Sequence, residues 1–224
     1  MAACGASPAR AEEVASFEEY SRPLLDAVAA LPPAEKAVLV GHSFGGQSLA
    51  LAMERYPEKV AVAVFVSAAM PAAGKAMTLV LEQFSQETGP DFYMDCTLET
   101  SGDRQNPVEI LQLGPQYLAQ RLYQLSPRED LNLAMAKVRS SRWFLNDDAT
   151  MKGNVLTAER YGAVRRVCVV AEDDASWSAD FQRRMASWNP GTEVRGLQGA
   201  DPMAMLSKPR ELSEVLMEMA DQYS

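Results

Sequence analysis

The residues with the clearest chemical potential are Gly41-His-Ser-Phe-Gly45, which match the pattern G-x-S-x-G. An apolar run, residues 37–40, precedes the pattern, and a helix-like run follows it. Glycines at these spacings permit a tight strand-to-helix turn that projects Ser43 beyond the end of the strand. The N–H of Phe44 and the start of the helix then face any oxyanion that forms nearby. The pattern predicts a nucleophilic serine, and the alternative is a strand-turn-helix junction with an incidental serine.

A nucleophilic serine needs a base, which is normally an imidazole oriented by a carboxylate. Candidate carboxylates are Glu172, Asp173 and Asp174, which directly follow the apolar run at residues 167–170, although an acidic solvated loop has the same composition. The base is missing, because the single histidine, His42, adjoins Ser43 on the turn and no histidine follows Asp174. Adjacent side chains on a tight turn point in different directions, so we expect His42 to line a pocket or to have a structural role.

Composition limits the remaining classes of function. The chain has 224 residues, 47% of them hydrophobic, and a formal net charge of −9, which argues against nucleic acid or anionic membranes as partners. Three scattered cysteines indicate neither a disulfide framework nor a zinc site, so we expect no metal and no cofactor. No secretory signal and no apolar run of membrane-spanning length is present, which predicts a cytoplasmic protein.

The elements that must position these residues alternate along the chain. Apolar runs at residues 37–40, 60–66 and 166–170 predict buried parallel strands, and a short strand is expected around Glu193 to Leu197. Helices are predicted from the S-x-x-E sequence at residues 16–19 to about residue 31, through residues 49–56 and 181–188, and from Pro209 onwards. The alternation breaks at residues 71–147, which we interpret as an inserted helical cap. The predicted class is α/β.

Several motifs in combination resemble the plant methylesterases and the related α-hydroxynitrile lyases of the α/β-hydrolase superfamily. The resemblance covers essentially the whole chain and is carried by residues 38–46, by Leu51-Ala-Met-Glu-Arg-Tyr-Pro57, by residues 123–131 and by residues 199–209. It implies one α/β-hydrolase domain, residues 1–224, with a mostly parallel sheet and a helical cap at residues 71–147. It also implies that Ser43 is the nucleophile and that Asp174 is the acid that orients the histidine. Members of this family hydrolyse methyl salicylate, methyl jasmonate and methyl indole-3-acetate.

Two departures from the family pattern bear on activity. The family reads G-A-D-H-M where this chain reads Gly199-Ala-Asp-Pro-Met203, so Pro202 stands in place of the catalytic histidine. The resemblance also reaches residue 1, so the first strands of the fold and the loop that lends a second oxyanion N–H are expected to be missing. That would leave the strand at 37–40 with an unpaired edge, which favours aggregation or pairing in a homodimer. Met203, where the lyases carry lysine, favours the esterase branch.

The predicted pocket is apolar and partly built from the cap. Its candidate lining residues are His42, Phe92, Tyr93, Leu122, Phe144 and Leu145, each of which has ordinary core packing as its alternative. Three functions remain open: a weak methyl-ester hydrolase that uses His42, Asp201 or water as a substitute base, a non-catalytic protein that binds a small apolar acid, and a chain that does not fold stably. We expect a poor catalyst, because loss of a triad base costs on the order of 10⁴ to 10⁶ in turnover.

Overall fold

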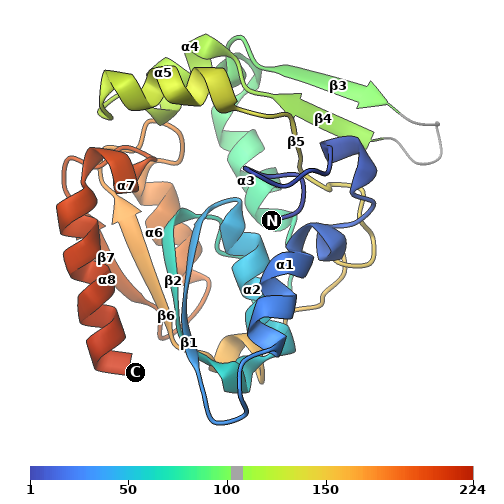
Figure 1. Ribbon diagram of the computed structural model, residues 1–224, viewed down its shortest axis with the longest axis vertical. Coiled ribbons are helices and arrows are strands. Elements are labelled where there is room, and N and C mark those ends of the chain that lie inside the picture. Colours follow the sequence, from blue (N-terminus) through green and yellow to red (C-terminus); the bar gives the residue numbers. More distant parts are fainter. Residues whose placement is uncertain (102–107, 224) are drawn as a thin grey trace.

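A four-stranded parallel sheet forms the centre of the computed structural model, which describes residues 1–101 and 108–223 (Figure 1). The strands are β1 (Ala37–Ser43), β2 (Val60–Ala68), β6 (Arg166–Ala171) and β7 (Glu193–Leu197), in the order β1-β2-β6-β7. β2 and β6 are almost wholly buried, as expected for β-branched runs covered on both faces. The four strands are confirmed in position, but β1 is only partly buried, in contrast to the prediction, because it lies at an edge of the sheet. Within the described part of the chain β1 pairs with β2 alone, and Val40 on β1 is 49% exposed.

Helices cover both faces of this sheet (Figure 1). α1 (Phe17–Ala29), α2 (Gly45–Arg55) and α6 (Ala179–Ser187) lie on one face, and α7 (Ala204–Ser207) and α8 (Pro209–Tyr223) lie on the other. Alternate residues of β2 serve the two faces, because Phe65 packs with the first group of helices and Val64 packs with the second. The Ser16 hydroxyl accepts a hydrogen bond from the N–H of Glu19, which confirms the predicted helix start.

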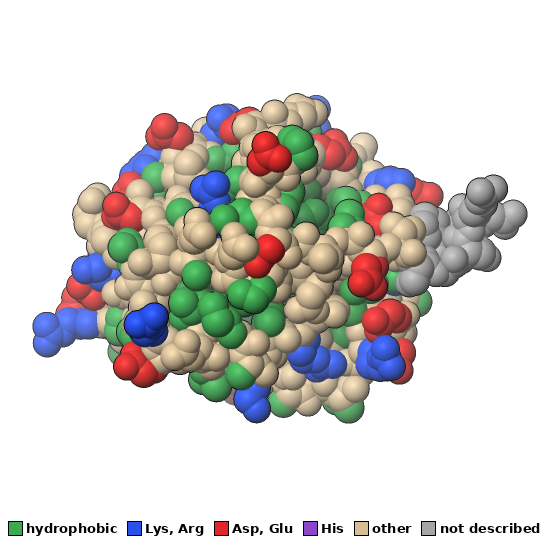
Figure 2. Space-filling model, turned by 90° about the horizontal axis from the view of Figure 1, so that it is seen from above, with side chains coloured by type: hydrophobic (Ala, Val, Ile, Leu, Met, Phe, Trp, Pro, Cys, Tyr) green, Lys and Arg blue, Asp and Glu red, His purple; other side chains and the backbone are tan. Residues whose placement is uncertain are grey.

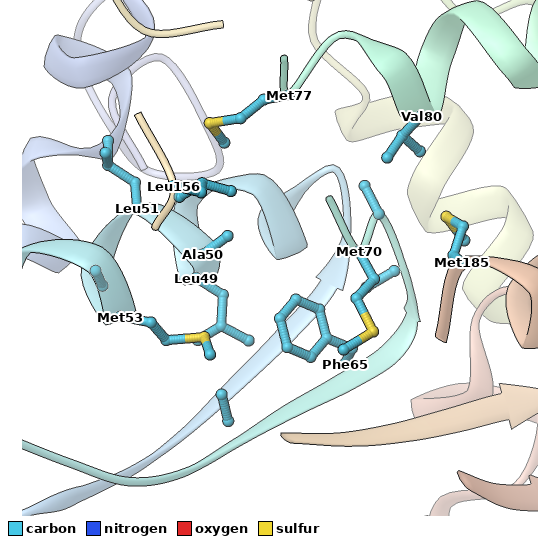
Figure 3. Packing of buried hydrophobic residues seen from close by; sticks show 14 of the residues in the cluster. Leu49, Ala50, Leu51, Met53, Phe65, Met70, Met77, Val80, Leu156 and Met185 are labelled. Atoms are coloured by element: carbon cyan, nitrogen blue, oxygen red, sulfur yellow. The ribbon is translucent and has the colours of Figure 1, made fainter. Parts of the chain in front are cut away.

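α2 is the central helix of the core, and it carries the turn that holds Ser43. Residues 46–54 of α2 are all buried, and Leu49 and Met53 pack with Phe65 and Met70 (Figure 3). Gly46 allows α2 to pack closely against the end of β2, since a Cβ atom at this position would lie 2.1 Å from the carbonyl oxygen of Ala69. The position of α2 against the end of β2 therefore depends on a residue without a side chain.

Residues 71–101 and 108–147 lie above the sheet, and we refer to them as the cap (Figure 1). They contain α3 (Leu79–Thr88), α4 (Pro115–Tyr117) and α5 (Arg128–Lys137). They also contain a three-stranded antiparallel sheet that the sequence analysis did not anticipate, made of β3 (Thr97–Ser101), β4 (Val108–Gln112) and β5 (Ser141–Arg142). These strands are short and β3 is exposed, so they lack the continuous apolar run that identifies the buried strands.

Single turns complete the described structure. The structure has 3₁₀ turns at Ala11–Glu13, Pro57–Lys59, Pro90–Tyr93 and Tyr161–Ala163, and a π-helical turn at Leu118–Leu122.

The guanidinium of Arg139 donates to the carbonyl oxygens of Gly5, Ser7 and Ala9, and these hydrogen bonds hold the first residues of the chain against the cap. On the face of the molecule formed by the cap, hydrophobic side chains lie among positively and negatively charged ones (Figure 2). Leu125, Leu133 and Met135 are among the exposed hydrophobic residues.

Candidate active site

The turn between β1 and α2 holds Ser43 in a conformation that favours reaction. Ser43 has φ of +53°, in the left-handed region that non-glycine residues seldom adopt, and its side chain is exposed. The chain doubles back tightly here, since a Cβ atom on Gly41 would lie 3.2 Å from the carbonyl oxygen of Gly45. The carbonyl oxygen of Ser43 accepts a hydrogen bond of 2.9 Å from the N–H of Ala69. The turn therefore has the geometry that the G-x-S-x-G pattern predicts.

Ser43 opens into a cavity of about 220 Å³ between the carboxyl ends of the strands and the cap. Much of the lining is aromatic and comes from α2, the cap and the segment after β6. The aromatic lining residues are Phe44, Phe84, Tyr93, Tyr117, Trp143 and Trp177. The polar lining residues are His42, Ser43, Ser67, Ser141, Asp174 and Ser176, and among residues 1–101 and 108–223 neither lysine nor arginine lines the cavity. Such a site suits a small, uncharged and largely apolar molecule.

The structure brings most of the predicted site residues together. Ser43, Phe44, His42 and Asp174 line the same cavity, and so do Tyr93 and Leu122 of the cap. The predicted juxtaposition of the serine and the acid thus joins β1 to the segment after β6, although 130 residues separate them in the chain.

Phe92 and Phe144 do not line this cavity, in contrast to the expectation from sequence. The Phe92 ring lies 5.1 Å from that of Phe84 and 5.8 Å from that of Tyr117, which places it in the layer behind the lining. The Phe144 ring contacts the rings of Phe17 and Tyr20 at the amino-terminal side of the core. Both rings are buried for the ordinary reason that large apolar side chains pack in the interior. Leu145 is also outside the lining.

Asp174 is a buried carboxyl group with four neutral donors. Its Oδ1 accepts the N–H groups of Ser176 and Trp177, each at 2.7 Å. Its Oδ2 accepts the hydroxyl of Ser67 and the amide of Gln182. Burial raises the pKa of Asp174 to about 7, even though these hydrogen bonds lower it, and the charge of Asp201 raises it further. None of the four donors is a cation or a base.

The imidazole of His42 forms a hydrogen bond with the loop after β7 rather than with Ser43. Its Nε2 lies 2.8 Å from the carbonyl oxygen of Pro202. A carbonyl oxygen only accepts, so Nε2 carries the proton and donates it. Burial lowers the pKa of His42 and keeps the ring neutral at pH 7. His42 therefore ties β1 to the loop after β7, in agreement with the predicted structural and pocket-lining role.

Asp201, another candidate for the substitute base, does not face the cavity. It is completely buried and accepts hydrogen bonds from the N–H of Leu125, the hydroxyl of Ser126 and the N–H of Met203. Leu125 and Ser126 belong to the cap, so this carboxylate fastens the cap to the loop at residues 198–203. Pro202 itself lines the cavity and offers no side-chain acceptor.

Several lining residues escaped the sequence analysis. Ser67 carried a usable signal, because it is the first polar residue at the carboxyl end of the apolar strand β2, and its φ is +39°. The aromatic residues Phe84, Tyr117, Trp143 and Trp177 come from four separate segments, and no local pattern marks them. Within residues 1–101 and 108–223 no group of His, Cys, Asp or Glu side chains is arranged to hold a metal ion. No helix in that part of the chain is long and apolar enough to cross a membrane.

Comparison with known proteins agrees with this geometry. A family model described as the alpha/beta hydrolase family matches residues 2–215. The probable esterase PIR7A of Oryza sativa subsp. indica is 54% identical over 223 residues, which cover 100% of this chain and 85% of that protein. Methyl jasmonate esterase 1 of Vitis vinifera is 40% identical over 225 residues, which cover 100% of this chain and 85% of that protein. The crystal structure of polyneuridine aldehyde esterase matches with a TM-score of 0.93 at 39% identity, covering 98% of this chain and 86% of that one. The resemblance to plant esterases and the predicted fold are confirmed.

Proposed function

Since this chain belongs to the alpha/beta hydrolase family, we propose that it is a serine carboxylic-ester hydrolase that acts slowly on methyl esters of small apolar acids. One observation carries the proposal: Ser43 is held at a left-handed turn and opens into a small aromatic cavity. The N–H of Phe44, at the amino end of α2, is positioned to stabilise the oxyanion. These features supply the nucleophile, part of the oxyanion site and the binding surface.

The reaction begins with attack of the Ser43 Oγ on the ester carbonyl carbon, and the negative charge develops beside the N–H of Phe44. Within the described part of the chain no side chain accepts a hydrogen bond from the Ser43 hydroxyl: the Nε2 of His42 donates to Pro202, and Asp174 is hydrogen-bonded to other donors. Water or hydroxide therefore accepts the proton. We expect turnover lower by on the order of 10⁴ than with a working base.

The substrate class follows from the lining of the cavity and from the relatives. An aromatic wall without lysine or arginine favours an uncharged ester over a free carboxylate, which Asp174 repels when it is ionised. Methyl jasmonate, methyl salicylate and methyl indole-3-acetate combine an apolar body with a neutral methyl ester, and they are the first substrates to test. The acidic composition and scattered cysteines support a cytoplasmic location as part of the same proposal.

Methanol release from these three methyl esters tests the proposal. The wild-type protein is compared with Ser43→Ala and with Ser213→Ala, a control at an exposed position on α8. We expect slow release that disappears in Ser43→Ala and persists in Ser213→Ala. Equal rates for the wild type and Ser43→Ala would contradict the assignment of Ser43 as the nucleophile.

Ligand binding without turnover is the second candidate, and Pro202 in the cavity wall favours it. Calorimetric titration of each methyl ester and of its free acid into the protein distinguishes the two functions. Saturable binding together with no methanol release dependent on Ser43 supports a binding protein. Because of Asp174, we expect the ester to bind more tightly than the acid at pH 8, and the opposite order would contradict this description of the cavity.

A further inference from the structure

Three polar side chains, Ser43, Ser67 and Asp174, line the cavity, and we call them its polar end. Within the described residues no imidazole or ammonium group forms a hydrogen bond with any of the three. Ser43 and Asp174 line the same cavity, and Pro202 lines it as well. We propose that this end of the cavity binds a small heteroaromatic nitrogen base of the imidazole type, which serves as a co-reactant in ester hydrolysis. The inference rests on the proposed role of Ser43 as the nucleophile.

An N–H donor on the ligand finds acceptors at Asp174 and Ser67. The carboxylate is buried and has only uncharged hydrogen-bond partners, so it gains more from a polarised N–H or a cation than from a further neutral group. The Ser67 hydroxyl lines the cavity too, and its oxygen retains lone pairs after it donates to Asp174. A five-membered ring with one N–H therefore has a matched acceptor at this end.

The second ring nitrogen faces a nucleophile that lacks a partner. No hydrogen bond from the Ser43 hydroxyl is found within residues 1–101 and 108–223, whereas His42 donates its Nε2 proton to Pro202. The Nδ1 of His42 is therefore unprotonated, but within those residues it forms no hydrogen bond with Ser43. An external ring with an unprotonated nitrogen can take the proton of Ser43 while its N–H faces Asp174, as general-base catalysis requires.

The walls of the cavity fit a flat and weakly basic ring. Tyr93, Tyr117 and Trp177 present aromatic faces, which attract both neutral heteroaromatic rings and their protonated forms. In the part of the chain that the structure describes, no lysine or arginine lines the cavity to repel the protonated form. At about 220 Å³ the cavity admits only small molecules, so a five-membered ring and an ester of few atoms are the matching pair.

The reaction that this arrangement supports is balanced without another reagent. The Ser43 Oγ bonds to the ester carbonyl carbon, and its proton moves to the free ring nitrogen. The bond to the methoxy oxygen then breaks, and the ring returns the proton to give methanol. Water repeats the sequence on the acyl-serine, which releases the acid and restores both Ser43 and the neutral ring.

Methanol release from methyl butyrate, measured with increasing imidazole at constant pH, tests the inference. We expect a saturable rise of about tenfold or more in the wild type, in line with the usual contribution of general-base catalysis, and none in Ser43→Ala. 1-Methylimidazole has a similar basicity but no N–H, and we expect it to give a much smaller rise. Equal effects of the two bases, or a rise that is linear and shared by Ser43→Ala, would overturn the inference.

Variants at the acceptor end give a second readout by ligand-observed NMR of imidazole binding. Asp174→Asn removes the charge, and binding should weaken in a sample that still melts cooperatively. Ser67→Ala frees an acceptor position on Oδ2 of Asp174, so binding should strengthen. Unchanged binding in both variants would contradict the site.

Failure of the inference is distinct from failure of the proposed function. Methanol release that depends on Ser43 in plain buffer, but that imidazole leaves unchanged, overturns the inference alone. Absence of release in buffer, followed by release that depends on both Ser43 and imidazole, supports the inference and contradicts slow turnover by the unaided protein. Absence of release that depends on Ser43 under both conditions overturns both.

Discussion

Asp201 links the cap to the hydrolase core, and its replacement by alanine should lower the stability of the protein. The carboxylate is completely buried and accepts two backbone N–H groups, those of Leu125 and Met203, at 3.0 Å each. It also accepts the hydroxyl of Ser126 at 2.8 Å. The hydroxyl can rotate to another acceptor, but the two N–H groups, whose hydrogen bonds are partly buried, lose their carboxylate acceptor. At about 1 kcal/mol or more for each of them, we expect a loss of about 2–3 kcal/mol.

Urea unfolding of Asp201→Ala measures this loss, with the slope m compared to confirm that both proteins unfold in the same way. Asp148→Ala is the matched control, because the side chain of Asp148 is 84% exposed and is paired only with Lys152 at the surface. The control should lie within about 0.5 kcal/mol of the wild type. A loss below about 1 kcal/mol for Asp201→Ala would refute the assignment of Asp201 as the link between cap and core.

Two further predictions concern α2 and Asp174. Gly46→Ala places a Cβ atom 2.1 Å from the carbonyl oxygen of Ala69, which is backbone and cannot move aside. We expect the free energy of unfolding, measured by thermal denaturation, to fall by about 3 kcal/mol or more. An unchanged melting temperature would contradict this packing. The pKa of Asp174 is about 7 in the folded protein and 3.8 in its reference state, so the folded state binds the carboxyl proton more tightly than the unfolded state does. The stability that Asp174 contributes therefore falls as pH rises from about 4 to about 7. The melting temperature of the wild type relative to Asp174→Asn should therefore decrease between pH 5 and pH 8, and a constant difference would show that the pKa of Asp174 is not raised.

Short-range patterns predicted the central sheet, because a strand buried on both faces must be apolar throughout. Residues 60–66 and 166–170 form β2 and β6 for this reason, and the helix start at Ser16 follows from its own side chain. Residues 37–40 form β1, although that strand is only partly buried. The antiparallel sheet of the cap has no such signature. Residues 97–101 contain one apolar side chain, Leu98, and they pair with β4 rather than with a neighbouring part of the core.

The chemistry of the site was only partly predictable, because it depends on contacts between distant segments. The motif indicated Ser43, and the acidic cluster after a strand indicated Asp174. That Ser67 donates to Asp174, across 107 residues, is a consequence of the order of β2 and β6 in the sheet. That His42 donates its Nε2 proton to Pro202, across 160 residues, fixes the tautomer and the orientation of the one imidazole in the chain. Neither hydrogen bond leaves a mark on local sequence.

The pH dependence of the covalent modification of Ser43 tests most directly the central claim, that Ser43 is a nucleophile without a side-chain base. The rate of labelling by a small fluorophosphonate is followed by mass spectrometry of the intact protein between pH 6 and pH 9, with Ser43→Ala as the control. Without a side-chain base the rate depends on hydroxide, so it should rise about tenfold for each pH unit with no plateau. A plateau above about pH 7 would reveal a working base beside Ser43 and would contradict the account.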